Sequence, residues 1–341
     1  MPLTVCISDI TTFSTTSTKN KNDATNKVRE NVLKELSNPP KEYLENAEFG
    51  NSWHMVSQSW KDALKKIAEE TNVPSYTSTQ VNVKGGRKFN YDLDAMYYDG
   101  PTLVAERKIE FKNGGPTICD LPQILSLQVK FGMFPVTYDK FYYENHLDKY
   151  IACDSCITEA KPSLQDYQKN VTSTNYTVTP FFAQVKARNS CFKKEKNEVV
   201  NASITDYLTK YGEELDINSF AEKIKDTQTG KNYLLWRNGK FWYDKLSQDE
   251  MSDMTYHSIK NGNLIEVKSG GNTIFRLLLR WRNYKGILNP AWQISVKRLK
   301  IKQRIPSVNA LRDICKEHGI APVPKKKKDI LAVLNERGIV Y

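Results

Sequence analysis

The sequence predicts an α/β protein in which helices flank a mixed sheet and a small two-helix module follows at the C-terminal end. Three observations predict this class. An amphipathic helical segment precedes three strand-like runs, further apolar and aromatic strand-like runs return after residue 230, and the composition changes near Pro306. The order of helical and strand-like patterns excludes a pure helical bundle or a pure β-sandwich.

The composition excludes several classes of protein. With 341 residues, of which 39% are hydrophobic, the chain can build about two packed domains, and wholesale disorder is excluded. No apolar run approaches the roughly 18 residues that span a bilayer, and the first residues do not resemble a secretory signal. We therefore expect an intracellular protein that is neither secreted nor in contact with a membrane, with its six cysteines as reduced thiols.

The first elements follow from hydrophobic spacing. Residues 1–40 are polar and predict a weakly ordered lead-in, with a short helix between Asn26 and Leu36. The main domain is expected over residues 41–305. Its first helix begins near Trp53 and has one apolar stripe: Trp53, Val56, Trp60, Leu64 and Ile67.

Three strand-like runs follow, at 76–83, 88–98 and 102–112. Asp99-Gly100-Pro101 separates the second run from the third, and Asp-Gly between apolar runs indicates a hairpin. A helix is expected over residues 120–132, because Pro122 would lie in its first turn.

The remainder of the main domain is less regular in pattern. Residues 140–260 read as an insertion with helical pieces near 203–225 and aromatic strands over 233–246. Apolar strand-like runs return from Asn263 onwards, and residues 306–341 form the predicted two-helix module.

Two adjacent strand-like runs carry many carboxylates and lysines. Asp92 and Asp94 lie on the first run, and alternate positions of the second are charged: Glu106, Lys108, Glu110 and Lys112. Alternation places these four side chains on one face of the sheet, where burial is costly without a metal or a charged ligand. Two carboxylates from adjacent strands suit Mg²⁺, which assists phosphodiester hydrolysis. A solvated edge hairpin is the alternative explanation.

This pattern resembles the PD-(D/E)xK nuclease superfamily, which has the restriction-endonuclease-like fold. In that family an acid on one strand and an acid-x-Lys motif on the next bind the metal, and helices flank the sheet. The resemblance covers about residues 50–135. It implies a metal site formed by Asp94 and Glu110, with Asp92 as neighbour or substitute, and Lys112 as the catalytic lysine.

Two strand registers select different residues for this site. A three-residue loop sets Asp94 opposite Glu106, which makes Glu106 and Lys108 the catalytic pair. A five-residue loop sets Asp92 opposite Glu110, with Asp94 on the diagonal. Both registers stay open at this point.

The residues between the charged positions favour the second register. Ile109 and Phe111 alternate with Glu110 and can pack beneath a helix, whereas Arg107 is awkward at a buried position. A strand that ends soon after its lysine, at Asn113-Gly114-Gly115, also matches the layout of the family better.

Two basic segments are candidate DNA contacts. The C-terminal module carries Lys325, Lys326, Lys327 and Lys328 between two short helical patterns, and it resembles the SAP motif, a two-helix DNA-binding module. The run from Arg276 to Arg304 interleaves basic and aromatic residues, with Arg280 and Arg282 as candidate contacts to phosphates. In both places, a packed core with solvated charges explains the same pattern.

Taken with the net charge of +11, which favours a polyanionic partner, these features predict a metal-dependent endonuclease that hydrolyses DNA phosphodiesters, of a restriction, viral or repair type. The expected cofactor is Mg²⁺, for which Mn²⁺ is expected to substitute. DNA is the expected partner, and a homodimer stays open. The rival hypothesis is a non-catalytic DNA-binding protein that keeps a nuclease-like fold.

Overall fold

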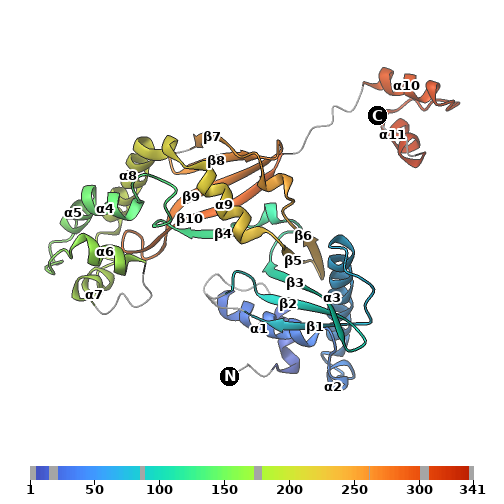
Figure 1. Ribbon diagram of the computed structural model, residues 1–341, viewed down its shortest axis with the longest axis horizontal. Helices are drawn as coiled ribbons and strands as arrows, with labels where there is room; N and C mark the ends of the chain where they lie inside the picture. Colours follow the sequence, from blue (N-terminus) through green and yellow to red (C-terminus); the bar gives the residue numbers. More distant parts are fainter. Residues whose placement is uncertain are drawn as a thin grey trace. The chain divides into compact units, whose positions relative to one another are not determined.

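The computed structural model describes residues 5–14, 22–84, 89–172, 179–260, 262–299 and 307–337. The chain divides into two units, Met1–Arg298 and Leu299–Tyr341. Within the described residues, the first unit contains two five-stranded sheets flanked by helices (Figure 1). The protein is therefore of the α/β class that the sequence predicts.

The first sheet joins an antiparallel meander to one parallel crossover. Its strand order is β1-β2-β3-β5-β6, in which β3 and β5 are parallel and the other pairs are antiparallel. These strands confirm the runs expected near 76–83, 88–98, 102–112 and 233–246. Their bounds are β1 (Ser78–Val83), β2 (Leu93–Asp99), β3 (Thr102–Asn113), β5 (Lys231–Arg237) and β6 (Lys240–Asp244).

Helix α3 (Gly50–Glu70) covers one face of this sheet with its predicted apolar stripe, and all five residues of that stripe are buried. Its indoles are also hydrogen-bonded: Trp53 Nε1 donates to the Ile7 carbonyl (2.8 Å) and Trp60 Nε1 donates to Ser37 Oγ (3.1 Å). Alternate strand residues meet the helix, among them Leu93, Ala95, Tyr97, Ile109 and Phe111. The short helix α2 (Lys41–Leu44) precedes α3.

The N-terminal segment differs from the weakly ordered lead-in expected over residues 1–40. In its described parts it forms the 3₁₀-helix η1 (Ile7–Phe13) and helix α1 (Asn22–Glu35). The predicted helix between Asn26 and Leu36 is confirmed in α1. The segment contributes Ile10, Phe13, Val32, Leu33 and Leu36 to the first core. A few apolar residues at helical spacing are thus enough to dock an otherwise polar segment.

The second sheet is antiparallel throughout, with strand order β4-β10-β9-β8-β7. The strands expected after Asn263 are confirmed there. The bounds are β4 (Leu125–Gln128), β7 (Thr255–Lys260), β8 (Leu264–Ser269), β9 (Thr273–Asn283) and β10 (Leu288–Arg298).

The prediction of a helix over residues 120–132 is wrong. This segment forms the short 3₁₀-helix η2 (Ile118–Asp120) and then strand β4, in which Leu125 opposes Ile294 and Leu127 opposes Trp292 of β10. Pairing with β10 outweighs the local helical pattern. Because this partner strand lies far away in the sequence, the local pattern could not reveal it.

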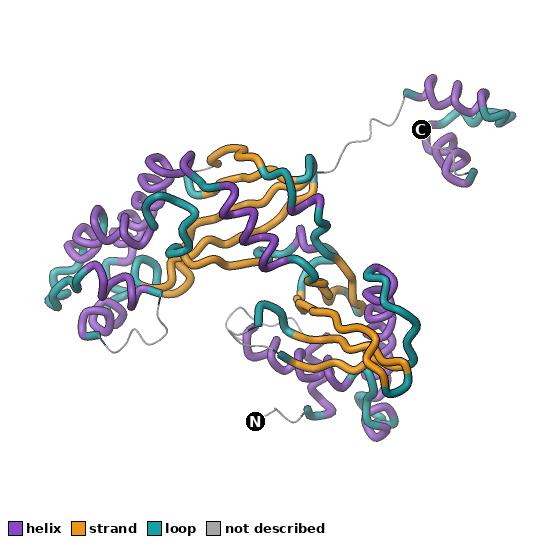
Figure 2. The backbone as a smooth tube through the Cα atoms, in the orientation of Figure 1, coloured by secondary structure: helices purple, strands orange, loops and turns teal. Residues whose placement is uncertain are grey.

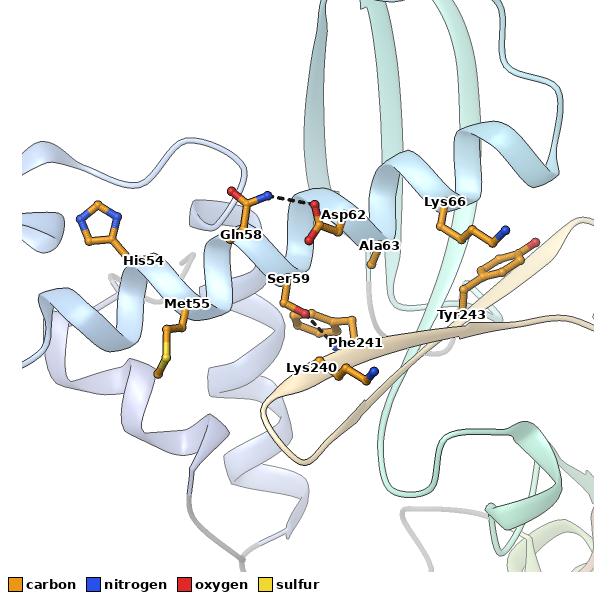
Figure 3. Close-up of a pocket in the computed structure, with 10 residues that line it drawn as sticks. All are labelled: His54, Met55, Gln58, Ser59, Asp62, Ala63, Lys66, Lys240, Phe241 and Tyr243. Carbon is orange, nitrogen blue, oxygen red and sulfur yellow. Dashed lines mark hydrogen bonds between the residues drawn. The ribbon is translucent and has the colours of Figure 1, made fainter. Parts of the chain in front are cut away.

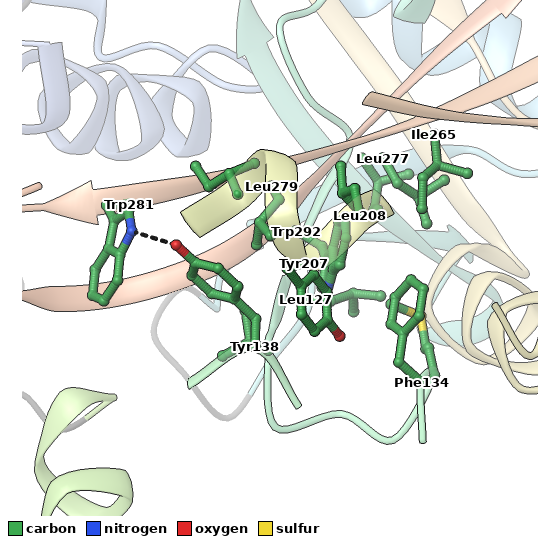
Figure 4. Close-up of a cluster of buried hydrophobic side chains, with 14 of the residues drawn as sticks. Leu127, Phe134, Tyr138, Tyr207, Leu208, Ile265, Leu277, Leu279, Trp281 and Trp292 are labelled. Atoms are coloured by element: carbon green, nitrogen blue, oxygen red, sulfur yellow. Dashed lines mark hydrogen bonds between the residues drawn. The ribbon is translucent and has the colours of Figure 1, made fainter. Parts of the chain in front are cut away.

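Helices cover one face of the second sheet. Helices α4 to α8 gather at one end of the sheet (Figures 1 and 2), and α9 lies across it, where Phe220 contacts Phe275 edge-on. The core beneath them is rich in aromatic rings, including Phe134, Tyr138, Trp281 and Trp292 (Figure 4). The helices are α4 (Tyr138–Asn145), α5 (Leu147–Ala152), α6 (Leu164–Val171), α7 (Pro180–Ala187), α8 (Lys193–Tyr211) and α9 (Ile217–Gln228), with the 3₁₀ turns η4 (Gly212–Glu214) and η5 (Asp249–Met251).

Strand β5 is shared by the two cores. Leu234 and Trp236 are buried in the core of the first sheet, whereas Tyr233 and Leu235 are buried in the core of the second. Successive side chains of a strand point to opposite faces, so β5 has one core on each side. The face of the first sheet that carries Glu110, the register partner of Tyr233, is therefore the face directed towards the second core.

Arg298, at the end of β10, links the second sheet to the segment that follows β6. Its guanidinium pairs with Asp244 (2.9 Å) and Glu250 (2.6 Å) and donates to the Lys245 carbonyl (2.7 Å). Several charge-assisted hydrogen bonds in a planar fork fix this segment firmly.

The second unit contains the two helices expected for the C-terminal module, α10 (Val308–Glu317) and α11 (Lys327–Glu336). They share a small core formed by Leu311, Cys315, Ile320, Ile330 and Leu334. Ser307 caps α10 by accepting a hydrogen bond from the Ala310 amide (3.2 Å). In the part of the chain that the structure describes, no helix combines the length and the apolar character needed to cross a membrane.

Candidate active site

Strands β2 and β3 pair in the second of the two registers. Leu93 opposes Ile109, and Asp94 opposes Lys108. The connection is tighter than the five-residue loop expected, because Asp99 opposes Thr102 across a two-residue turn. A register shift between Tyr97 and Tyr98 supplies the extra residue and restores the alignment in which Asp92 lies across from Glu110.

The structure brings Asp92, Glu110 and Lys112 together. Lys112 Nζ lies 2.5 Å from Glu110 Oε1 and 3.6 Å from Asp92 Oδ2. The same Asp92 oxygen accepts a hydrogen bond from the Phe111 amide (2.9 Å), which fixes the carboxylate against β3. Two carboxylates from neighbouring strands therefore surround one cationic nitrogen.

Two further residues belong to this site, and the sequence analysis missed both. Lys231, the first residue of β5, is buried, and its Nζ lies 3.4 Å from Glu110 Oε2. Glu30 of α1 is half-buried, and its pKa is raised to about 7, mainly by burial and then by the charges of Asp92 and Glu110, with Lys112 acting against them. Nothing in the sequence around Glu30 or Lys231 indicates a site, because each is one more charged residue on or beside a predicted helix or strand.

We define the carboxylate–lysine group as Glu30, Asp92, Glu110, Lys112 and Lys231. Burial alone lowers the pKa of Lys112, but the carboxylates of Glu110 and Asp92 outweigh it, and the net shift is upward. Burial raises the pKa of Asp92, Lys112 opposes this, and the charge of Glu110 adds to it. Burial lowers the pKa of Lys231 in spite of Glu110. The lysine between the two carboxylates is therefore protonated at neutral pH.

Asp94, expected as the leading metal ligand, lies outside this group. Its buried carboxylate pairs with Lys84 at 3.0 Å. Among the described residues, no ion pair joins Asp94 to Lys112 or Lys231. The register explains the difference, because Asp94 lies across from Lys108, whereas Asp92 shares Lys112 with Glu110.

The first-register pair, Glu106 and Lys108, is exposed, and Glu106 lies across from Met96 rather than from an acid. Arg107, which looked awkward at a buried position, is only half-buried. It donates to Thr71 Oγ1 (2.8 Å) and to the Thr71 carbonyl (3.0 Å) at the end of α3. A cation at a helix C-terminus is favourable, so Arg107 has a structural role.

The donor set fits a divalent cation, although not as a complete protein cage. Among the described residues, no group of three or more His, Cys, Asp or Glu side chains lies close enough to hold a metal ion. Asp92 and Glu110 nevertheless each place a carboxylate oxygen within 3.6 Å of the same ammonium nitrogen. Mg²⁺ commonly takes one or two carboxylates and completes its shell with water and substrate phosphate, so these two residues would hold it.

Replacing Glu30 with Gln is expected to stabilise the metal-free protein at about pH 8 but not near pH 4.5. The folded-state pKa of about 7 lies above the ordinary 4.5, so folding favours the protonated carboxyl. Wild-type stability therefore falls as the pH rises through this window, and the Gln variant avoids a loss of about 2 kcal/mol. Denaturant unfolding at both pH values measures the difference, with Glu35→Gln on the same helix as the control. A gain that is equal at both pH values would exclude this role.

The candidate DNA contacts lie on exposed surfaces. Along β9, Phe275, Leu277 and Leu279 point into the core, whereas Arg280 lies on the other face and donates to Gln293 Oε1 (2.6 Å). Arg282, at the end of the strand, is also exposed.

Much of the rest of the basic run is structural. Arg276 pairs with Glu266 (2.7 Å), and Trp281 and Trp292 are buried in the core. In the C-terminal unit Lys325, Lys326 and Lys328 are exposed and Lys327 is half-buried, while the Lys325 carbonyl accepts a hydrogen bond from Arg312 (2.9 Å).

A groove of about 620 Å³ lies between α3 and β6, away from the carboxylate–lysine group (Figure 3). Among its lining residues, Asp62 is the acid, and it accepts a hydrogen bond from Gln58 (2.9 Å). The groove therefore lacks paired carboxylates and is not the candidate site.

Comparisons with known proteins add no relative to this picture: no family model, no curated protein and no solved structure matches the chain.

Proposed function

We propose that this protein hydrolyses DNA phosphodiester bonds with the help of Mg²⁺. One observation carries the proposal: Asp92 and Glu110, on neighbouring strands, each place a carboxylate oxygen within 3.6 Å of the ammonium nitrogen of Lys112, two residues after Glu110. The mixed sheet with helices on its flanks supports the resemblance to the PD-(D/E)xK nucleases.

The acidic residues and the lysine of the site have different proposed roles. Asp92 and Glu110 would hold the metal. When bound, Mg²⁺ supplies charge stabilisation to the phosphate and a lower pKa to an attacking water. Lys112 is protonated, so it does not remove a proton; its ammonium stabilises charge that develops on the phosphate oxygens.

The DNA partner is supported by charge. The chain has a net charge of +11, and exposed basic side chains occur on the second sheet (Arg280, Arg282) and in the C-terminal unit (Lys325, Lys326, Lys328). Such side chains neutralise phosphates and release counterions, the main sequence-independent source of affinity for nucleic acid. The C-terminal unit would add binding strength to the catalytic core.

Incubation of the purified chain with supercoiled plasmid tests the proposal. With Mg²⁺ or Mn²⁺ we expect conversion to nicked and linear DNA, and with a chelator we expect none. A protein that binds the plasmid but leaves it intact with either metal would instead be the non-catalytic DNA-binding protein. A parallel incubation with RNA shows which of the two nucleic acids is the substrate.

A further inference from the structure

A basic cleft of about 620 Å³ opens beside the carboxylate–lysine group. One wall is the β3 segment around Lys108, and the other is residues 245–248, which follow β6. Lys231 lines the cleft and also reaches Glu110 (3.4 Å), so one side chain connects the cleft to the candidate site. The lining residues are Thr71, Glu106, Arg107, Lys108, Gly230, Lys231, Asn232, Lys245, Leu246, Ser247 and Gln248.

The cleft has an excess of positive charge, although Lys231 is paired with Glu110. Its lining includes four basic side chains, Arg107, Lys108, Lys231 and Lys245, and Glu106 is the acid among them. Arg107 and Lys245 also donate to carbonyls at the end of α3, those of Thr71 (3.0 Å) and Glu70 (3.0 Å). Carbonyl oxygens leave the charge of these cations in place, so the cleft attracts anions.

Lys108 is the basic side chain best placed to meet a ligand. It is exposed, and its ammonium lies 5.6 Å from the centre of the Tyr91 ring. Ser247 and Gln248 on the opposite wall are exposed and add polar groups that can hydrogen-bond phosphate or sugar oxygens. The two walls together offer cations and hydrogen-bonding groups, which suits a sugar–phosphate backbone.

The far wall is held in place before any ligand arrives. Arg298 binds the Lys245 carbonyl (2.7 Å) and pairs with Asp244 (2.9 Å) and Glu250 (2.6 Å) on either side of this wall. A preformed wall reduces the ordering cost of binding.

We propose that this cleft binds the sugar–phosphate backbone of the DNA strand next to the phosphate that is cleaved. The inference rests on the proposed function, since it assigns the path of the substrate towards Asp92 and Glu110. It also gives a binding role to Lys108, which the first register had made catalytic.

DNA binding without metal tests the inference separately from cleavage. Fluorescence anisotropy of a labelled duplex in chelator, over a range of salt, compares Lys108→Ala and Lys245→Ala with wild type. Each variant is expected to bind about fivefold more weakly and to reduce the slope of log K against log salt by about one. Lys61→Ala, at an exposed position of α3 outside the cleft, should match wild type.

The results separate this inference from the proposed function. Weaker binding in both cleft variants, in a protein that shows no Mg²⁺-dependent cleavage, would support the cleft and reject the nuclease. Wild-type affinity and slope in Lys108→Ala and Lys108→Glu would overturn the cleft, even if the protein cleaves DNA normally. Failure of the wild-type chain to bind DNA would overturn it as well. Unfolding curves of Lys245→Ala check its fold, because that side chain also contacts α3.

Discussion

Glu110→Gln and Asp92→Asn are each expected to reduce Mg²⁺-dependent cleavage by about 10³-fold. Each substitution removes one of the two carboxylates that converge on Lys112 and are proposed to hold the metal, and it leaves a side chain of the same shape. A neutral amide binds Mg²⁺ far more weakly than a carboxylate, so the charge stabilisation at the phosphate is lost. Initial rates of plasmid nicking at a fixed Mg²⁺ concentration measure the effect.

Asp94→Asn is the matched control for these variants. Asp94 lies two residues from Asp92 on the same segment, but it pairs with Lys84 instead of Lys112. We expect this variant to keep most of its activity. An inactive Asp94→Asn together with an active Asp92→Asn would restore the assignment that the sequence alone favoured.

The two inactive variants should differ in stability. Removing a carboxylate from a crowded acidic face usually relieves repulsion, and we expect this for Asp92→Asn. Glu110, however, pairs with both Lys112 and the buried Lys231, so Glu110→Gln leaves a buried ammonium without its partner. That loss is costly, and a second substitution, Lys231→Met, should recover part of it.

Lys112→Met is expected to reduce cleavage by about 10²- to 10³-fold at saturating Mg²⁺, and Lys112→Arg should retain a small part of the activity. The raised pKa keeps Lys112 charged at neutral pH, so its contribution is electrostatic, and an arginine preserves the charge but not its position. Rates over a range of pH give the check. Wild-type rates in both variants would remove Lys112 from the site.

The same substitution has a second readout that does not depend on catalysis. Without Lys112, the carboxylates of Asp92 and Glu110 face each other without the cation that now lies between them. Lys112→Met should therefore be less stable than wild type in chelator and gain more stability than wild type when Mg²⁺ is added. Equal Mg²⁺-induced shifts in melting temperature would contradict a metal position beside this lysine.

Local patterns predicted the strands and the second register. Alternation of Ile109 and Phe111 with Glu110 favoured that register, because these apolar residues can pack beneath a helix, as they do in the first core. The loop length was wrong, since the bulge between Tyr97 and Tyr98 leaves no mark in the sequence. Residue spacing therefore indicated the pairing correctly but not the path of the turn.

The site residues that were missed depend on distant contacts. Glu30 joins the group because α1 docks on the first sheet, and Lys231 joins it because β5 pairs with β3 across a long crossover. The separation of Asp94 from this group has a related reason. Only the three-dimensional arrangement shows that Lys84 pairs with Asp94. Sequence reasoning indicated that carboxylates and lysines gather on these strands but not which charges neutralise one another.

The sharing of β5 by two cores also affects how the chain folds during synthesis. Lys108 and Lys231 are register partners but lie about 120 residues apart along the chain, so β3 remains an open sheet edge until most of the intervening segment has left the ribosome. In that interval Glu110 has no Lys231 beside it, and the side chains that later surround the site are still unfolded. A nascent chain therefore completes the carboxylate–lysine group only late in synthesis, and the unpaired edge of β3 is open to intermolecular pairing until then.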